Sequence, residues 1–571
     1  MRPMPLSNLV QSLLAKRGIV EPEAVAAFLQ PDYASLHHPL GILGMDRAVS
    51  RTLEAMEKGE RIAIYADFDC DGIPGAALLS DVFAKLNYSN IEVYIPHRDK
   101  EGYGFHTSAI ESLAERGVKL IVTVDVGTNA REAVDFAKRH GVDVIVTDHH
   151  EVTGELPAAV AILNPKLGDY PFPHLCGTGV AFKFAQALIA GGRARGMGDF
   201  TAVAEGWEKW LLDLVAIATV ADMVPLTGEN RTLVFWGLSV LRKSPRLGIT
   251  ALCGALRIRK HELTENDIGF SIAPRINAAS RMGEPRVALT LLTTKDRAEA
   301  ERCAAELESL NASRKGVVAG IVREAKKRAK RFDDASRLPA GRQVVVLGDT
   351  EWKPALLGLA ANSILNDRAG RLPAGRQVVC LWGRDANGKL KGSCRSDGSV
   401  SVVELFSSAR ESFEEFGGHA ASGGFTLVAE QVHTLQESLS AALGKIPSAE
   451  GESASGEHDA LITLREVSAA LFSDLSRLAP FGIGNAKPVF LIREACAVSV
   501  KSFGKEKNHV EVQLTCATSG YRARAFDFFR TSESFTYLPP VGGPASVLAT
   551  IERDTFRGGL ALRLIDILPA Q

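Results

Sequence analysis

The sequence lacks the features that direct a chain into a membrane or out of the cell. Its 571 residues contain no apolar run of about 18 or more, and the first twenty hold no continuous apolar segment of the signal-peptide kind. Eight cysteines are scattered without a Cys-x-x-Cys pair, which argues against a zinc knuckle and for a reducing compartment. We therefore expect a cytoplasmic protein that does not contact a membrane.

Net charge is also nearly absent. The 66 lysines and arginines almost balance the 67 acidic residues, so the formal net charge is −1. Any contact with nucleic acid must therefore come from a local basic surface. The hydrophobic content of 46% is ordinary for a globular protein, and the length predicts three or four domains.

The most informative stretch is residues 61–79, RIAIYADFDCDGIPGAALL. Residues 62–66 form a short apolar run of the kind that a buried parallel strand needs. Three carboxylates follow at alternate positions: Asp67, Asp69 and Asp71. Such crowding costs free energy through like-charge repulsion unless cations share the space. A metal site is therefore favoured over the alternative, a solvated acidic turn.

Two further apolar runs end in the same way. Residues 119–124 stop at Asp125, and residues 142–147 stop at the triplet 148–150, Asp-His-His. Helical stretches separate the three runs, which predicts βαβ units in a parallel sheet. Right-handed crossovers bring the carboxyl ends of such strands to one edge, where open α/β sheets bind ligands. The aspartates and histidines are therefore expected to face one cleft.

These motifs resemble those of a known family. The Asp-x-Asp-x-Asp-Gly stretch at 67–72, the Asp-x-Gly at 125–127 and the Asp-His-His triplet at 148–150 are similar to the motifs of the DHH phosphoesterase superfamily. The longer chain resembles the RecJ branch of that superfamily, the single-strand-specific 5′→3′ DNA exonucleases of bacteria. The resemblance extends over most of the chain.

The motifs and the resemblance together imply a metal centre. The predicted ligands are Asp67, Asp69, Asp71, Asp125, His149 and Asp222. Asp67 is either a metal ligand itself or an acid that contacts a ligand. An oxygen-rich set with one imidazole suits Mn²⁺ or Mg²⁺ better than zinc, and two ions are expected. For catalysis, Asp148 is expected to orient a histidine and His150 to lie near the phosphate.

Other residues are predicted to bind the substrate. They are Tyr103, Arg275, Asn277, Arg281, Ser393, Arg395, Ser396, Gly418 and His419. Tyr103 lies in a Gly-flanked stretch, where an ordinary packed tyrosine is an equal alternative. Residues 273–282 read as an otherwise uncharged loop whose two arginines suit phosphate. Residues 392–396 and 417–419 are predicted to form Gly-rich turns that cradle phosphate.

The fold expected from these patterns is α/β: a parallel-sheet DHH metal domain, a smaller α/β DHH-associated domain and a C-terminal OB-like β-barrel. The predicted ranges are 1–44 for a helical lead-in, 45–298 for the DHH domain, 299–335 for a basic connector helix, 336–450 for the DHH-associated domain and 458–571 for the OB-like domain.

Four segments leave alternatives open. The basic stretch 314–331 is either a solvated linker helix or one wall of a DNA channel. The Gly pair at 177–179 opens a helix whose amides face an anion, or serves close packing. The repeats RLPAGRQVV at 337–345 and 371–379 read as surface-loop insertions. The C-terminal module, with its basic tip at 501–507, grips single strands or is an interaction domain.

The resemblance implies a metal-dependent 5′→3′ exonuclease that degrades single-stranded DNA in repair and recombination. The alternatives are a phosphodiesterase for short RNA or cyclic dinucleotides, a pyrophosphatase-type phosphatase, and a catalytically inactive replication scaffold. Inactive scaffolds lose metal ligands, and this chain keeps every acid and histidine of the motif. Single-stranded DNA is the expected partner, with a single-strand-binding protein and a helicase as further candidates.

Overall fold

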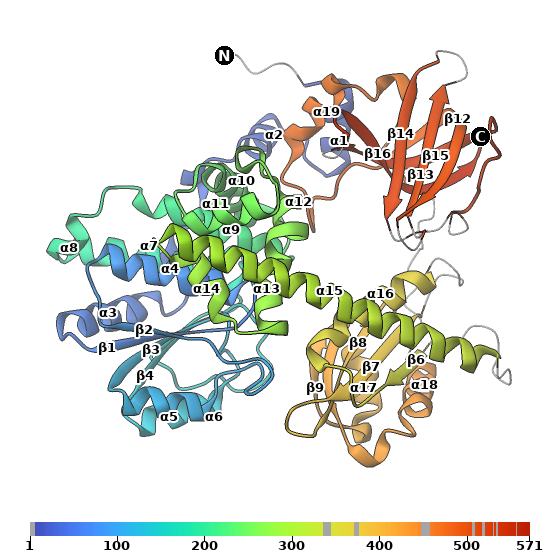
Figure 1. Cartoon of the computed structure of the whole chain (residues 1–571). Helices are drawn as coiled ribbons and strands as arrows, with labels where there is room; N and C mark the ends of the chain where they lie inside the picture. Colours follow the sequence, from blue (N-terminus) through green and yellow to red (C-terminus); the bar gives the residue numbers. More distant parts are fainter. Residues whose placement is uncertain are drawn as a thin grey trace. The chain divides into compact units, whose positions relative to one another are not determined.

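The protein is described from a computed structural model (Figure 1). The structure describes residues 6–334, 344–369, 376–446, 457–504, 507, 509–516, 520–528, 530, 532, 535–554 and 557–570. The first residues of each RLPAGRQVV repeat, 337–343 and 371–375, lie outside these residues. The chain divides into two compact units: unit 1 comprises Met1–Gln30, Val317–Ala479 and Lys487–Gln571, and unit 2 comprises Pro31–Gly316 and Pro480–Ala486. Each unit is described by itself.

Unit 2 is built on a five-stranded sheet with the order β2-β1-β3-β4-β5. All of its strand pairs are parallel. The strands are β1 (Arg61–Ala66), β2 (Ile91–Tyr94), β3 (Val118–Val124), β4 (Asp143–Thr147) and β5 (Ala161–Leu163). Their carboxyl ends share one edge of the sheet, as the three apolar runs predict. The strands β2 and β5 were not predicted because they are only four and three residues long.

Helices cover both faces of this sheet (Figure 1). Successive residues of a strand point to opposite faces of the sheet. Ile62 and Ile64 therefore pack in one core with α4 (Gly72–Lys85) and α7 (Gly177–Ala194), whereas Ala63 and Tyr65 pack in another with α5 (Thr107–Glu115) and α6 (Arg131–Arg139).

The other helices of unit 2 are α3 (Met45–Glu57), α8 (Gly198–Thr201), α9 (Leu212–Ala221), α10 (Gly228–Lys243), α11 (Leu247–Ala255), α12 (Glu265–Asp267), the π-helix η5 (Ile268–Ile272), α13 (Ala273–Met282) and α14 (Arg286–Thr293).

One prediction for this unit is wrong. Residues 273–282 form the helix α13 and not a loop. Pro274 lies at the start of that helix, directly after the π-helix η5 (Ile268–Ile272), and it has no backbone N–H to donate to the preceding turn.

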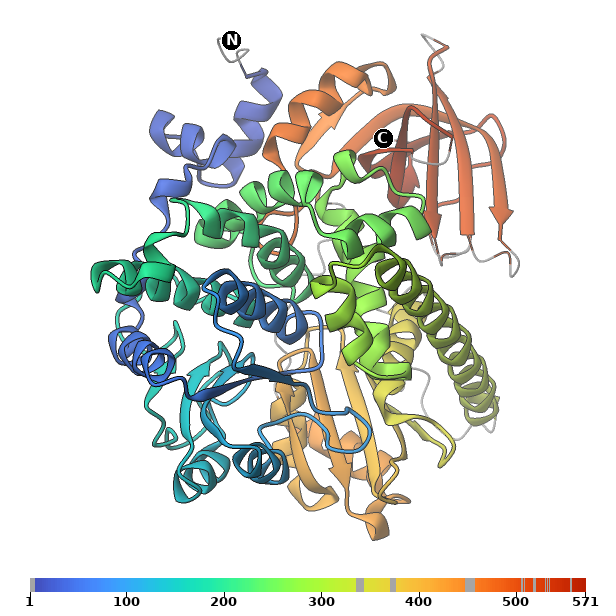
Figure 2. The same ribbon diagram turned by 60° about the vertical axis from the view of Figure 1, so that its left-hand side comes forward.

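The long helix α15 (Arg297–Asp334) contains the predicted basic connector and is the olive-green helix of Figure 2. Beyond it, unit 1 contains a second sheet with the order β6-β7-β8-β10-β9. The pair β6–β7 is parallel and the other pairs are antiparallel. These strands are β6 (Val344–Gly348), β7 (Val378–Arg384), β8 (Leu390–Ser396), β9 (Phe413–His419) and β10 (Ser422–Leu427), with helices α16 (Pro354–Ala369), α17 (Val402–Ser408) and α18 (Leu435–Lys445).

The predicted Gly-rich turns of this sheet are also wrong. Residues 392–396 lie within β8 and residues 417–419 lie within β9. The glycines serve close packing of strands: a Cβ at Gly418 would lie 2.3 Å from the carbonyl oxygen of Ser422 on the neighbouring strand.

The C-terminal strands of unit 1 close into a barrel. The order is β11-β12-β13-β14-β16-β15, and an additional pairing of β12 with β15 closes five of them while β11 lies beside β12. Closure removes the sheet edges of these five strands, as in small OB-like barrels. The strands are β11 (Ala460–Ile462), β12 (Phe490–Phe503), β13 (His509–Cys516), β14 (Arg522–Phe528), β15 (Pro544–Arg553) and β16 (Leu560–Pro569), with helix α19 (Ala469–Leu475).

The predicted helical lead-in forms α1 (Asn8–Lys16) and α2 (Pro22–Leu29), and α2 begins at the predicted Pro22. The backbone N–H of Ser7, the N-cap of α1, donates a 3.3 Å hydrogen bond to Asp474 Oδ2. Among the helices that the structure describes, none is long and apolar enough to cross a membrane.

Candidate metal centre

The first group of carboxylates lies in the turn between β1 and α4. Asp69 Oδ1 accepts hydrogen bonds from the backbone N–H of Asp71, at 2.8 Å, and of Gly72, at 3.2 Å. Gly72 is required because a Cβ there would lie 2.3 Å from the carbonyl oxygen of Asp67. The turn therefore folds tightly around its own acids.

Asp71 is held by the first turn of α7. Its carboxylate accepts from the N–H groups of Gly177, at 2.6 Å, and Thr178, at 2.8 Å. Gly177 also packs closely, since a Cβ there would lie 2.6 Å from Asp125 Cβ. Both alternatives for this glycine pair therefore apply: the helix amides face an anion, which is a carboxylate of the chain itself, and the glycine permits close packing.

Asp125 follows β3 in a left-handed backbone conformation, with a φ of 60°. Its N–H donates to the carbonyl oxygen of Thr147 on β4, at 2.9 Å, which continues the pairing of the two strands. Asp and Asn tolerate this conformation better than most residues with a side chain. The backbone thus turns the carboxylate toward the edge of the sheet.

Asp148 organises the Asp-His-His triplet after β4. Its carboxylate accepts from His150 Nδ1 at 2.7 Å, from the His149 N–H at 2.7 Å and from the Thr128 N–H at 2.8 Å. Burial acts to raise the pKa of Asp148, but the hydrogen bonds from His150 and Thr128 outweigh it and hold the pKa below its usual range. Asp148 is therefore ionised, and it fixes the orientation of the His150 ring.

His149 lies among three carboxylates. Its Nε2 is 3.2 Å from Asp125 Oδ1, 3.6 Å from Asp222 Oδ2 and 3.8 Å from Asp71 Oδ2. Asp222 comes from the end of α9, where it is the C-cap residue. The structure thus brings together the ends of three strands and one helix, as the sequence predicts.

Burial and mutual repulsion oppose the ionisation of the carboxylates in this cluster. Burial, reinforced by the charges of Asp71 and Asp69, raises the pKa of Asp222 to about 9. Burial also raises the pKa of Asp67 and Asp125 well above the usual range, and neighbouring carboxylates add to both shifts. Carboxylates that repel one another in this way form a site for cations.

The side chains fit divalent ions. Three groups of ligand atoms lie within 4.8 Å of one another in the described part of the chain: Asp125–His149–His150, Asp71–His149–Asp222 and Asp67–Asp69–Asp125. In addition, Asp67 Oδ1 and Asp125 Oδ1 are buried without a hydrogen-bond partner. A bound cation would satisfy both oxygens, and oxygen ligands with imidazole suit Mn²⁺ and Mg²⁺. The geometry also places His150 within reach of a metal, a role that the sequence did not predict.

Removal of metal should make stability strongly dependent on pH. The pKa of Asp222 is about 9 in the folded protein against an ordinary value of 3.8, so in chelator the folded state retains a proton that the unfolded chain releases. The free energy of unfolding should therefore fall as the pH rises between these two values. Mn²⁺ should flatten this dependence because the cation replaces the proton. Urea unfolding from about pH 5 to 8, with and without Mn²⁺, measures it, and equal slopes would contradict the assignment.

Two residues near the centre were missed or left without a role. Asn164, directly after β5, is fully buried and donates from Nδ2 to the carbonyl oxygen of His150 at 2.9 Å and to Thr128 Oγ1 at 3.1 Å. The guanidinium of Arg98 lies over the Phe68 ring at 4.8 Å, and burial lowers its pKa against the opposing charges of Asp67 and Asp69. The polar residue that ends an apolar run was the available signal for Asn164.

The predicted substrate residues of unit 2 have different surroundings. The hydroxyl of Tyr103, whose side chain is half exposed, lies 3.3 Å from His150 Nδ1. Arg275 is paired with Glu308 at 2.8 Å, and Asn277 Oδ1 accepts from the N–H of Cys70 at 2.9 Å. Arg281 lies on α13. Tyr103 thus lies beside His150 of the candidate centre. Asn277 instead binds the backbone of the turn between β1 and α4, which carries Asp67, Asp69 and Asp71.

The predicted phosphate-binding residues of unit 1 lie on β8 and β9. Arg395 donates to the carbonyl oxygen of Cys394 at 2.7 Å, and its guanidinium lies beside Gly358 of α16, where a Cβ would be 2.5 Å away. Ser393 is beside the same glycine, with its Oγ 3.2 Å from that Cβ position. Ser396 donates to the carbonyl oxygen of Val400 within its own turn. The side chain of His419 lies outside the described residues.

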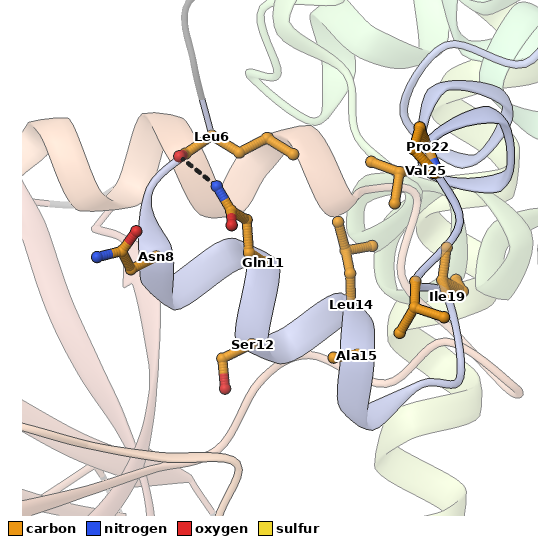
Figure 3. Close-up of a pocket in the computed structure, with 10 residues that line it drawn as sticks. Leu6, Asn8, Gln11, Ser12, Leu14, Ala15, Ile19, Pro22 and Val25 are labelled. Carbon is orange, nitrogen blue, oxygen red and sulfur yellow. Dashed lines mark hydrogen bonds between the residues drawn. The ribbon is translucent and has the colours of Figure 1, made fainter.

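A separate pocket of about 570 Å³ lies beside α1 and α2 (Figure 3). Its lining includes Gln11, Leu14, Ile19 and Val25, and none of the residues that line it is titratable. The pocket therefore offers no acid, base or charged metal ligand, unlike the cluster of aspartates and histidines in unit 2.

Comparisons with known proteins agree with this picture. A model of the DHH family N-terminal domain matches residues 61–219, a model of the DHHA1 domain matches 341–445, and a model of the RecJ OB domain matches 458–565. The fold and these matches define a protein of the DHH class with a DHHA1 domain and a RecJ OB domain.

Relatives narrow the class further. The chain is 35% identical over 511 residues to the single-stranded-DNA-specific exonuclease RecJ of Bacillus subtilis, a match that covers 89% of this chain and 62% of the relative. It is 31% identical to RecJ of Haemophilus influenzae, over 93% of this chain and 91% of the relative. The chain belongs to the RecJ family of single-stranded-DNA-specific exonucleases.

Solved structures of a relative contain divalent metal ions. RecJ of Thermus thermophilus in complex with Mn²⁺ is similar over 100% of this chain and 79% of that chain, with a TM-score of 0.76 and 26% identity. A second structure of that protein contains Mg²⁺, with a TM-score of 0.70. The chain spans less than two thirds of the length of the Bacillus subtilis relative.

Proposed function

We propose that the chain hydrolyses the phosphodiester bonds of single-stranded DNA progressively from the 5′ end, with Mn²⁺ or Mg²⁺. The observation that carries this proposal is the centre at the edge of the parallel sheet, where Asp67 Oδ1 and Asp125 Oδ1 are buried without a hydrogen-bond partner. Membership of the RecJ family supports the substrate and the polarity. The activity serves DNA repair and recombination.

The residues of the centre divide into ligands and supporting groups. Asp67, Asp69, Asp71, Asp125, His149 and Asp222 would hold two cations. When bound, such cations polarise a phosphate and lower the pKa of a bound water. Asp148 accepts from His150 Nδ1 and thereby keeps the proton on that atom, which leaves Nε2 to face a phosphate oxygen or a cation. The helix amides of Gly177 and Thr178 hold Asp71 in place for the same purpose.

The barrel supplies a surface for single strands. Phe528 is 41% exposed, and its ring lies 5.9 Å from Phe503 and 5.3 Å from His509. The Arg563 guanidinium lies 4.7 Å from the centre of the Phe528 ring. Exposed aromatic rings beside basic side chains bind single strands without reading their sequence. The basic tip is described only in part, because residues 505 and 506 lie outside the described residues.

Phe528→Ala should weaken the binding of a long single strand by about 5- to 150-fold, since stacking on one base contributes roughly 1–3 kcal/mol. The slope of affinity against salt should stay unchanged because no phosphate contact is lost. Lys501→Ala, in contrast, should reduce that slope by about one. Fluorescence anisotropy at several salt concentrations measures both, with Val541→Ala, which is 75% exposed in the same module, as the control. Unchanged affinity in Phe528→Ala would assign this surface to a protein partner.

One experiment tests the proposed function as a whole. Single strands labelled at the 5′ or the 3′ end, a blunt duplex and a cyclic dinucleotide are incubated with Mn²⁺, Mg²⁺ or chelator. We expect early release of the 5′ label in metal and no reaction in chelator. Equal hydrolysis of duplex, or a preference for the cyclic dinucleotide, would favour another branch of the superfamily.

We propose the cytoplasm as the compartment and a single-strand-binding protein and a helicase as protein partners. All eight cysteines are free and seven of them are buried, which supports a reducing compartment. The partners rest on the family resemblance alone.

A further inference from the structure

A short segment of the C-terminal sequence packs within the metal-bearing unit. Residues Pro480–Ala486, Pro-Phe-Gly-Ile-Gly-Asn-Ala, lie inside the stretch that the RecJ OB domain model matches, yet they belong to unit 2 with Pro31–Gly316. The sequence placed this segment within the predicted OB-like domain, 458–571. Its contacts indicate another role.

The segment is bound to the loop that follows Asp222. The N–H of Leu226 donates to the carbonyl oxygen of Ile483 at 2.7 Å. Gly482 allows this approach, because a Cβ there would lie 2.7 Å from Leu226 Cδ1. Gly484 adopts a φ of +76° and passes close to Thr227, where a Cβ would lie 3.0 Å from Cγ2. The two glycines therefore permit the backbones of the segment and the loop to meet.

Hydrogen bonds within the segment, and one from α10, fix its conformation. Gly482 and Asn485 exchange two backbone hydrogen bonds, of 3.0 and 3.1 Å. The buried Asn485 donates from Nδ2 to the carbonyl oxygen of Pro480 at 2.8 Å, and Arg231 of α10 donates to the same oxygen at 3.3 Å. A segment held by these bonds can support the loop that follows Asp222.

The loop between α9 and α10 carries Asp222 at one end. It turns sharply at Met223, which has a φ of 62°, and four residues after Asp222 it reaches Leu226. Asn230 donates to the carbonyl oxygen of Pro225 at 3.0 Å. Hydrogen bonds thus connect the loop's outer part both to the start of α10 and to the Pro480–Ala486 segment.

We propose that the Pro480–Ala486 segment is a positioning element for Asp222, and so couples the C-terminal part of the chain to metal binding independently of its grip on DNA. This inference rests on the proposed function, in which Asp222 is a metal ligand. Groups that support metal ligands typically change metal affinity or activity by about 10- to 100-fold when they are altered.

The test compares Mn²⁺ binding and DNA binding in the same full-length variants. Gly482→Ala forces Leu226 to move, and we expect the Kd for Mn²⁺, measured by calorimetry without DNA, to rise by about 10-fold. The affinity for a single strand in chelator should stay within about twofold, since the barrel surface is unchanged. Gly444→Ala is the matched control because nothing lies within 4 Å of the added Cβ.

Two further variants make each outcome decisive. Asn485→Ala removes the bond to Pro480 without adding bulk, so it replaces Gly482→Ala if that variant melts at a much lower temperature. Unchanged Mn²⁺ affinity in the folded variant would overturn the inference, as would an equal loss of metal-free DNA binding. Asp222→Asn distinguishes the metal-ligand role of Asp222 from the positioning role of the segment. If this variant keeps full Mn²⁺ affinity, the assignment of Asp222 in the proposed function fails. If it loses affinity and the segment variants do not, only the positioning role fails.

Discussion

Asp125→Asn is expected to fold normally and to lose at least about 10³-fold in turnover, which corresponds to roughly 4 kcal/mol of transition-state stabilisation. Asp125 contributes an oxygen to two of the three candidate ligand groups, and its buried Oδ1 has no hydrogen-bond partner. Asparagine keeps the size of the side chain and tolerates the φ of 60° at this position, whereas alanine would add backbone strain. The loss can then be attributed to the missing charge.

Initial rates on a 5′-labelled single strand in Mn²⁺, together with thermal melting in chelator, measure this effect. Asp135→Asn, a neutralisation on α6 away from the carboxyl ends of the strands, is the matched control and should keep normal turnover. Melting in chelator should not fall in Asp125→Asn, because the substitution removes one of the repelling charges. Near-normal turnover would remove Asp125 from the centre.

Arg395→Ala is expected to weaken single-strand binding by about 10- to 100-fold, because hydrogen bonds to charged groups contribute roughly 1.5–3 kcal/mol each. Among the residues that the structure describes, no carboxylate forms an ion pair with Arg395, and burial lowers its pKa. A partly buried guanidinium without an acidic partner suits a phosphate oxygen. Ser393, beside the same glycine of α16, adds a hydroxyl to this site.

Binding of a labelled strand and calorimetric Mn²⁺ binding should be measured side by side. The Kd for the strand should rise, while the Mn²⁺ affinity stays within about twofold of the unaltered protein, because the ligands all lie in unit 2. Arg384→Ala, an exposed arginine at the end of β7 in the same sheet, is the control for loss of a positive charge. Arg395→Lys should recover only part of the affinity, since an ammonium cannot form a bidentate fork. Loss of Mn²⁺ binding in Arg395→Ala would refute this division of roles.

The convergence of the candidate metal ligands at one sheet edge could be predicted largely from local patterns. Each of three apolar runs ends in ligand-type residues, and parallel strands connected by right-handed crossovers place such ends at one edge. The five-stranded parallel sheet confirms that prediction. Strand length limited the rest of the prediction. The strand β5 has three residues, too few for a periodic pattern, so the only signal for Asn164 was a polar residue at the end of an apolar run.

Glycines misled the prediction at β8 and β9. A Gly-rich sequence indicates a turn when only neighbours in the chain are considered. Here Gly392 faces Phe425 across the sheet, where a Cβ would lie 2.1 Å from the ring, and Gly418 faces the backbone of β10. The absence of a side chain serves packing between strands, which a local pattern cannot distinguish from a turn.

The sequence by itself determined the α/β class, the order of the domains, the identity of the acids and imidazoles and the kind of metal that they suit. These follow from residue type and from periodicity over a few residues. Only the tertiary structure decided that the α7 amides hold Asp71, that Asn277 binds the backbone of Cys70 and that Pro480–Ala486 packs against the loop after Asp222. Each of these contacts joins groups more than a hundred residues apart, often through backbone atoms that every residue possesses. Such contacts depend on which distant segments the tertiary fold brings together, so no local pattern of side chains encodes them.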